Sequence, residues 1–152
     1  MSEGAKVLGI DLSDGNNEET KTLCPKDTFV PLNADITLAK TWETTLLLGE
    51  QHFGSEPSII VNCAGVVHLG AEPHEVTEDM FDLVFKVNVK PIYLAVKVII
   101  PRWIETGTHG SFINIGSISQ ARPRPTTTWY AASKGAVTAV CLRRLSYQAF
   151  IF

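Results

Sequence analysis

Apolar and β-branched residues gather in four short runs along the chain. Runs of this length and composition predict β-strands. The predicted strands cover residues 6–11, 28–32, 58–62 and 111–116. In the last two runs the apolar residues are consecutive instead of alternating, which is typical of strands covered by helices on both faces. We therefore expect a parallel α/β sheet.

Two segments between these runs carry apolar residues at helical spacing. One follows a possible cap at Asp35 or Thr37, and the other follows Thr77, where Glu78 and Asp79 suit the positive end of a helix dipole. The apolar positions are Leu38, Trp42, Leu46 and Phe53 in the first segment, and Phe81, Val84, Phe85 and Ile92 in the second. The order strand, helix, strand, helix agrees with an α/β fold.

Composition and charge narrow the class of protein. The 152 residues are 45% hydrophobic and 19% charged, which predicts one globular domain. The formal net charge of −3, with scattered Lys and Arg, argues against a nucleic-acid partner. The longest apolar stretches, 58–69 and 91–104, fall short of the ~20 residues that a membrane span requires, so no membrane partner is expected. No secretory signal is readable at the first residues, and we expect a cytoplasmic location.

The cysteines and histidines do not form a recognisable site. Cys24, Cys63 and Cys141 are too few and too far apart for a disulfide framework, so they are predicted to be free thiols. The four histidines lack the spacing of metal ligands, and no metal is expected.

Tyr130 and Lys134 lie four residues apart in a predicted helix over residues 129–140, so that their side chains share one face. A tyrosine hydroxyl is a useful base near neutral pH only if a positive charge favours the phenolate, and Lys134 is placed to supply one. Ser117, at the end of a predicted strand, offers a hydroxyl that can hold a substrate oxygen. The spacing alone is most often an ordinary, partly exposed pair, so the surrounding sequence decides its meaning.

Four sequence motifs give that context. They are Ile113-Asn-Ile-Gly-Ser117, Tyr130-Ala-Ala-Ser-Lys134, Asn62-Cys-Ala-Gly65 and Asn88-Val-Lys-Pro91. Taken in their order along the chain, they resemble the active-site segments of the short-chain dehydrogenase/reductase family, and the resemblance runs from about Gly4 to Val140. It looks nearest to 3-oxoacyl-carrier-protein reductases and to sugar or hydroxysteroid dehydrogenases.

The resemblance implies hydride transfer between NAD(P)(H) and a small-molecule alcohol or carbonyl substrate. Tyr130 would be the general acid/base, and Lys134 would favour its ionised form and bind the nicotinamide ribose. Ser117 would orient the carbonyl, and Asn88 would hold a relay water. The cofactor contacts implied in this half of the chain are Asn62, Ala64, Gly65, Tyr130 and Lys134. A homodimer or homotetramer, as in the family, is also implied.

Two acidic residues bear on the adenosine half of the cofactor. Asp11 ends the first predicted strand, where an acid can bind both ribose hydroxyls and repel a 2′-phosphate, which favours NAD over NADP. The alternative is that Asp11 only opens the turn through residues 13–15. Asp35 resembles the adenine-contacting aspartate of the family, but an aspartate ahead of a helix is also an ordinary N-cap.

Pro91 has no backbone N–H, so the carbonyl of Val87 loses its helical partner. A kink there would leave a carbonyl free to hold water near Asn88, and an unbroken hydrogen-bond ladder through residues 85–95 would contradict this hypothesis. The alternative is a plain division into two helices at Pro91.

The chain also departs from the family pattern. It has no Thr-Gly-x-x-x-Gly-x-Gly turn, whose backbone would approach the cofactor pyrophosphate. We expect a single, partial Rossmann-type domain over residues 1–152, a doubly wound parallel sheet that lacks the first strand, the Gly-rich turn and the C-terminal strand. Two interpretations follow: an oxidoreductase, or a catalytically silent fragment that at most associates with related subunits through its two long helices.

Overall fold

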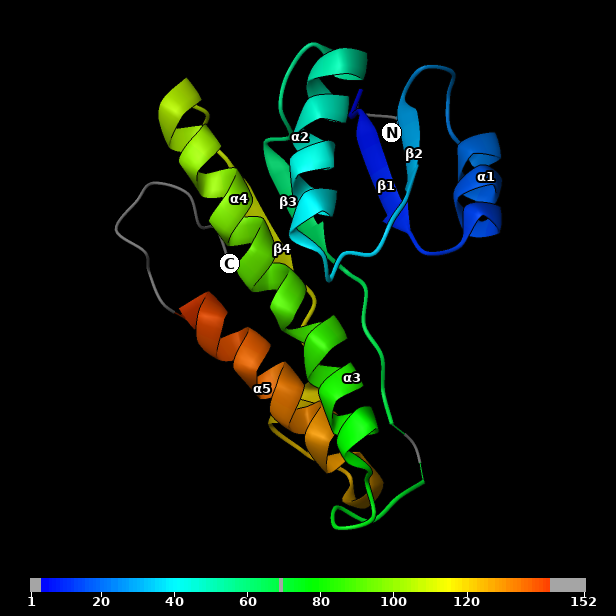
Figure 1. The fold of residues 1–152 in the computed structure, drawn as a ribbon, viewed down its shortest axis with the longest axis vertical. Coiled ribbons are helices and arrows are strands. Elements are labelled where there is room, and N and C mark those ends of the chain that lie inside the picture. Colours follow the sequence, from blue (N-terminus) through cyan, green and yellow to red (C-terminus); the bar gives the residue numbers. More distant parts are fainter. Residues whose placement is uncertain (1–3, 69, 143–152) are drawn as a thin grey trace. The chain divides into compact units, whose positions relative to one another are not determined.

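The computed structural model describes residues 4–68 and 70–142 of the chain. These residues form two compact units that meet in the sequence between Pro57 and Ser58. We call residues 4–57 the N-terminal unit and residues 58–142 the C-terminal unit. Figure 1 labels the helices and strands of both. The single domain expected over residues 1–152 stays a prediction.

The N-terminal unit contains two strands and two helices, β1 (Val7–Asp11), α1 (Asp14–Leu23), β2 (Phe29–Asn33) and α2 (Ala39–Phe53). The strands are parallel, with Val7 opposite Phe29. Gly9 is required where it stands, because a Cβ built there would lie 2.5 Å from the ring of Phe29. Phe29, Trp42 and Leu46 form the buried apolar core of this unit. Both strands were predicted from the sequence, with bounds that differ by one residue.

Helix α1 was not predicted, because it has no apolar stripe. It begins after the cap residue Ser13, whose hydroxyl accepts a hydrogen bond from the N–H of Asn16. Asn17 is its buried residue, and its side-chain Nδ2 donates to the carbonyl of Leu32 at 3.2 Å. A polar contact, which hydrophobic periodicity does not detect, therefore links this helix to β2.

Helix α2 begins differently from the prediction. Its N-cap residue is Leu38, which makes no side-chain cap bond, so the expected cap at Asp35 or Thr37 is wrong. Asp35 instead accepts the N–H of Thr37 at 2.8 Å, in a turn that precedes the helix. The helix ends at Gly54, which has a φ of 73° and donates to the carbonyl of Glu50.

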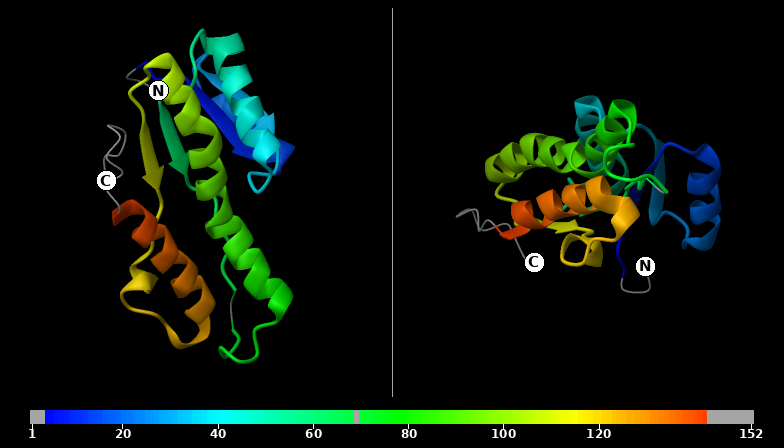
Figure 2. Two further views of the ribbon diagram at one scale, coloured as in Figure 1. Left: turned by 60° about the vertical axis from the view of Figure 1, so that its left-hand side comes forward. Right: turned by 90° about the horizontal axis from the view of Figure 1, so that it is seen from below.

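The C-terminal unit contains two strands, three α-helices and two short 3₁₀ turns. These are β3 (Ile59–Asn62), α3 (Glu78–Asn88), α4 (Lys90–Thr106), β4 (Ser111–Asn114), η1 (Ile118–Gln120), η2 (Pro125–Thr127) and α5 (Thr128–Leu142). Strands β3 and β4 are parallel, with Ile59 opposite Ser111 and Asn62 opposite Asn114. Helix α5 packs against α3 and against η1. Figure 2 shows α5 running alongside α3, which is followed directly by α4.

The core of this unit lies on one face of the strand pair. Ile60 and Phe112 are 5% and 3% exposed, and the ring of Trp103 lies 5.1 Å from that of Phe112. The residues on the other face are open: Ile59 is 61% exposed and Val61 is 53% exposed. The expectation that helices cover both faces of these strands is therefore wrong for the described part of the chain.

The parallel α/β class is confirmed, and so is the expectation that strands lack a neighbour. Among the described residues, β1 pairs only with β2, and β3 pairs only with β4, so the strands form two separate two-stranded sheets. Each pair has a free edge whose backbone groups have no partner strand.

The long helical segment is interrupted at Val89, between α3 and α4 (Figure 2). Val89 has a φ of −118° and is the N-cap residue of α4, and its carbonyl accepts the N–H of Ile92, only three residues ahead. The helical hydrogen-bond ladder through residues 85–95 is therefore interrupted. The interruption lies at Val89, two residues before Pro91. Pro91 lies in the first turn of α4, where its missing N–H costs little.

The structure bears on the cysteines and on the length and apolar character of the helices. Cys24, Cys63 and Cys141 are free, as predicted. Within residues 4–68 and 70–142, no helix combines the length and the apolar character that crossing a membrane would demand.

Candidate active site

Tyr130 and Lys134 lie on the first two turns of α5 and share one face, as their spacing predicts. Lys134 is buried, at 5% exposure. Its ammonium Nζ donates to the carbonyl of Ile115 at 2.7 Å and lies 5.9 Å from the centroid of the Tyr130 ring. A buried ammonium is thus held beside a phenol, with a strand-end carbonyl as its partner.

The backbone of Tyr130 is held at both of its polar groups. Its carbonyl accepts a hydrogen bond from the hydroxyl of Ser133 at 2.7 Å, and that hydroxyl accepts one from Asn88 Nδ2 at 2.9 Å. Its N–H donates to Nε2 of His68 at 3.3 Å. Ser133 is fully buried, and His68 is 3% exposed. Neither contact was predicted: His68 lies 62 residues before Tyr130, outside the four motifs, and Ser133 lies within the Tyr130–Lys134 motif without an expected role.

Asn88, at the end of α3, uses its side chain to join two segments. Its Oδ1 accepts the N–H of Val66 at 2.8 Å, and its Nδ2 donates to the carbonyl of Val66 at 2.9 Å as well as to Ser133. The side chain is therefore occupied with the loop after β3 and with α5. The relay water expected near Asn88 stays a prediction, which the broken helix at Val89 permits.

Ser117 caps the short turn η1, which packs against α5. Its hydroxyl accepts the N–H of Ser119 at 3.2 Å and donates to the hydroxyl of Ser119 at 3.1 Å. To hold a substrate oxygen, the Ser117 hydroxyl has to turn away from Ser119, which a rotation of its O–H bond can achieve.

The segment after β3 approaches the same side chains. A Cβ built at Gly65 would lie 3.1 Å from Oδ1 of Asn88 and 3.6 Å from Nζ of Lys134. Only a residue without a side chain leaves this approach uncrowded. Asn62 is tied into the sheet instead, since its Nδ2 donates to Oδ1 of Asn114 at 2.7 Å. Ala64 is exposed next to Gly65.

Asp11 and Asp35 belong to the N-terminal unit. Oδ1 of Asp11 accepts the N–H of Ser13 at 2.7 Å, so this acid does open the turn that follows β1. Oδ1 of Asp35 likewise accepts the N–H of Thr37, and Asp35 is not the N-cap of α2. Their contacts with a cofactor stay predictions.

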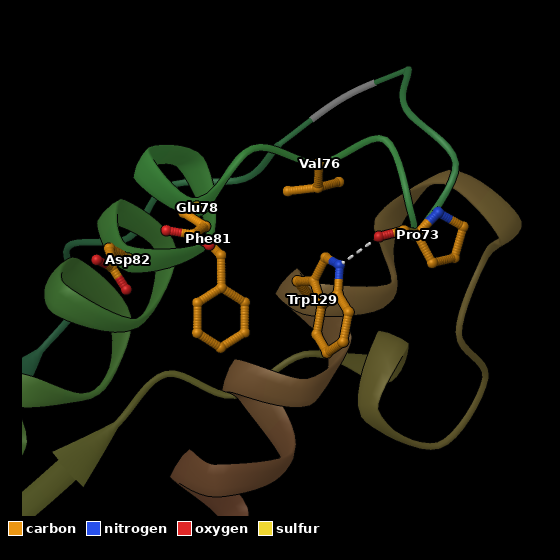
Figure 3. A pocket seen from close by; sticks show the side chains of 6 residues that line it. All are labelled: Pro73, Val76, Glu78, Phe81, Asp82 and Trp129. Atoms are coloured by element: carbon orange, nitrogen blue, oxygen red, sulfur yellow. Dashed lines mark hydrogen bonds between the residues drawn. The ribbon is translucent and has the colours of Figure 1, made fainter.

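A pocket of about 400 Å³ lies directly beside the start of α5. Its lining residues, drawn in Figure 3, are Pro73, Val76, Glu78, Phe81, Asp82 and Trp129. The indole Nε1 of Trp129 donates to the carbonyl of Pro73 at 2.9 Å, and its ring meets that of Phe81 edge-on at 5.3 Å. The predicted site residues do not line this pocket, but Trp129 immediately precedes Tyr130.

No group of three or more His, Cys, Asp or Glu side chains in the described segments is arranged to hold a metal ion. Phenol, ammonium, hydroxyl and amide groups are gathered around the start of α5.

Comparison with known proteins decides the family. The model of the short chain dehydrogenase family matches residues 1–144. The chain belongs to that family. The Tyr130 and Lys134 pair, the Ser117 turn and the break after Asn88 are therefore found in a short-chain dehydrogenase fold, as the resemblance implied.

Individual relatives of this short-chain dehydrogenase cover different parts of it. The chain is 40% identical over 79 residues to 4-formylbenzenesulfonate dehydrogenase from Comamonas testosteroni, which covers 52% of this chain and 31% of that protein. It is 31% identical over 144 residues to (3R)-3-hydroxyacyl-CoA dehydrogenase from Homo sapiens, covering 89% of this chain and 55% of that protein.

Among solved structures, the 3-ketoacyl-(acyl-carrier-protein) reductase of Brucella melitensis, complexed with NADH, superposes with a TM-score of 0.83 at 29% sequence identity. The match covers 92% of this chain and 58% of that structure. The chain thus spans about half the length of most of the relatives that it matches.

Proposed function

We propose that this short-chain dehydrogenase is an NAD(P)-dependent oxidoreductase acting on an alcohol or carbonyl substrate. The observation that carries the proposal is the pairing on α5: the buried ammonium of Lys134 lies 5.9 Å from the ring centroid of Tyr130. This arrangement places an ammonium beside the phenol that would exchange a proton with a substrate oxygen.

The remaining groups have complementary roles. Tyr130 moves the proton to or from the substrate oxygen, and the Ser117 hydroxyl orients that oxygen beside the phenol. Asn88 holds the loop after β3 against α5 and so keeps Gly65 beside Lys134. The nicotinamide would supply or accept the hydride.

The residues present fit the nicotinamide half of such a cofactor. Gly65 leaves open the space beside Lys134 that a Cβ would crowd, and Lys134 uses one N–H on Ile115, so that two ammonium protons remain for ribose hydroxyls. The reductase from Brucella melitensis, which is complexed with NADH, supports a nicotinamide cofactor. Asp11 favours NAD over NADP on charge. The Gly-rich pyrophosphate turn is not part of the 152 residues.

A second candidate function is association with related subunits without catalysis. Helix α4 favours it, because Tyr93 and Ile104 on that helix are 60% and 63% exposed. A chain that binds no NADH but sediments as a dimer, or co-purifies with a full-length relative, would support this candidate over the oxidoreductase.

The experiment that tests the oxidoreductase combines a binding titration with one substitution. Purified chain is titrated with NADH and NADPH by fluorescence, and turnover is measured with Tyr130→Phe beside the unmodified chain. Removing the phenol should lower kcat by about 10²- to 10⁴-fold while the Kd for NADH changes by less than about two-fold, because the hydroxyl acts in the chemical step.

Tyr93→Phe is the matched control, since Tyr93 is an exposed tyrosine on α4. Its kcat should equal that of the unmodified chain. If neither nicotinamide binds, or if Tyr130→Phe turns over as fast as Tyr93→Phe, the oxidoreductase proposal is wrong for this chain.

A further inference from the structure

His68 is a buried titratable side chain for which the proposed reaction has no stated use. It lies in the loop between β3 and α3, residues 63–77, and is 3% exposed. Imidazoles are seldom this deeply buried unless both ring nitrogens have a partner. The partners of this ring therefore need an explanation.

One ring nitrogen holds the start of α5. Nε2 of His68 accepts the backbone N–H of Tyr130 at 3.3 Å. Tyr130 is the third residue of α5, and the first N–H groups of a helix have no carbonyl partner within it. His68 thus caps α5 from a loop that precedes it in the sequence by 62 residues.

The other ring nitrogen has no partner. Since Nε2 accepts a hydrogen bond in this contact, the ring proton lies on Nδ1. Nδ1 is buried and makes no hydrogen bond to any described residue. A leucine would fill the same space without leaving a buried donor unpaired. The ring is therefore better explained by what Nε2 does for Tyr130 than by packing.

The same loop also forms a hydrogen bond with Trp129, the residue before Tyr130. The carbonyl of Pro73 accepts the indole N–H of Trp129 at 2.9 Å, and Figure 3 shows this hydrogen bond between two residues that line the pocket. Two successive residues of α5, Trp129 and Tyr130, are thus tied to one loop, the first by a side chain and the second by its backbone. The loop fixes the first turn of the helix that carries the phenol.

We propose that His68 is a positioning residue for Tyr130: its Nε2 anchors the Tyr130 backbone and so holds the phenol beside Lys134. The proposal rests on the proposed role of Tyr130 as the acid/base. Ser133 holds the carbonyl of Tyr130 from the other side, so loss of His68 leaves the residue held at one group only. A displaced phenol should slow the proton transfer without weakening the binding of the cofactor.

The first test needs no measurement of activity. Long-range ¹H–¹⁵N correlation spectra of the ¹⁵N-labelled chain report which ring nitrogen of each histidine carries the proton, and His68→Gln assigns the His68 signals. We expect His68 to be protonated on Nδ1. A ring protonated on Nε2 cannot accept the Tyr130 N–H and would overturn the proposal.

The second test separates positioning from packing. His68→Leu keeps the bulk and removes the acceptor, whereas His68→Gln keeps an acceptor oxygen. We expect His68→Leu to lower kcat about 10- to 100-fold with the KM for the nicotinamide cofactor within about two-fold, and His68→Gln to recover most of the loss. His74→Leu, at an exposed histidine of the same loop, is the matched control and should leave kcat unchanged.

The outcomes distinguish this proposal from the proposed function. If Tyr130→Phe is slow and His68→Leu is as fast as the unmodified chain, His68 does not position Tyr130 and the function stands. If Tyr130→Phe is not slowed, the function fails and the positioning role fails with it, whereas the protonation of the ring still tells whether the contact itself forms in solution.

Discussion

Asp11 and Asp35 of the N-terminal unit differ from Asn88 and His68 of the C-terminal unit in how far along the chain their hydrogen-bond partners lie. Ser117 of the C-terminal unit resembles the two acids, since its partner is two residues ahead. In the N-terminal unit, the carboxylates of Asp11 and Asp35 each accept an N–H two residues ahead. In the C-terminal unit, the hydrogen bonds of Asn88 and His68 join residues that are 22 to 62 positions apart. The contacts of the two acids are local turns, which do not require the folded unit. The contacts of Asn88 and His68 do require it.

This difference has an energetic meaning. Asn88 and Lys134 are 4% and 5% exposed, and buried polar groups stabilise a fold only when their hydrogen bonds are made. In the C-terminal unit the same side chains therefore support both the fold and the candidate site. In the N-terminal unit the hydrogen bond of Asp11 lies within a local turn, so Asp11 can change with little effect on folding.

The largest stability effect is expected in the apolar core of the C-terminal unit. Trp103→Ala removes a ring that packs against Phe112 and should lower the free energy of unfolding by about 3–5 kcal/mol. Ile104→Ala, at a 63% exposed neighbour, should change it by less than about 0.5 kcal/mol. Urea unfolding followed by circular dichroism measures both. Equal effects would show that the apolar side of this unit does not hold it together.

The next effect tests whether the long-range polar contacts stabilise the C-terminal unit. Asn88→Ala leaves the N–H and carbonyl of Val66 without their side-chain partner, so we expect a loss of about 2–4 kcal/mol in the free energy of unfolding. Asn33→Ala, at an exposed asparagine of the N-terminal unit, should cost less than about 0.5 kcal/mol. A small effect at Asn88 would remove the contrast between the units.

The smallest effect concerns Asp11. Asp11→Asn keeps an oxygen that can accept the Ser13 N–H but removes the charge, so stability should hardly change. If Asp11 lies beside the adenosine ribose, the ratio of NADPH to NADH affinity should rise about tenfold, because a 2′-phosphate is no longer repelled. Asp27→Asn is the control, since asparagine tolerates the φ of 62° at that exposed position. Titration of both variants decides whether Asp11 does more than shape a turn.

Much of the fold could be predicted from the sequence, because its signals are local. The four strands agree with the apolar runs, and the Thr77 cap of α3 agrees with the acids that follow it. Helix α1 could not be predicted, since its one buried residue, Asn17, is polar. The covering of β3 was predicted wrongly: consecutive apolar residues show that both faces are apolar, but not whether anything packs on each.

The candidate site follows the same division. The spacing of Tyr130 and Lys134 gave their shared face, because helix geometry relates residues four apart. The spacing could not predict the contact between His68 and Tyr130, since a hydrogen bond across 62 residues exists only after the loop has packed against α5. The hydrogen bond between the Trp129 indole and the Pro73 carbonyl could not be predicted for the same reason.

The register of the two strand pairs has a consequence for the order in which they form. Val7 pairs with Phe29, whereas Ile59 pairs with Ser111, so the chain that must be closed into a loop is more than twice as long in the second pair. Each doubling of a loop adds roughly 0.6 kcal/mol of closure entropy, and helices α3 and α4 must also pack within that loop. During folding, β1 and β2 are therefore able to meet early, whereas β3 and β4, and the phenol that depends on them, come together late.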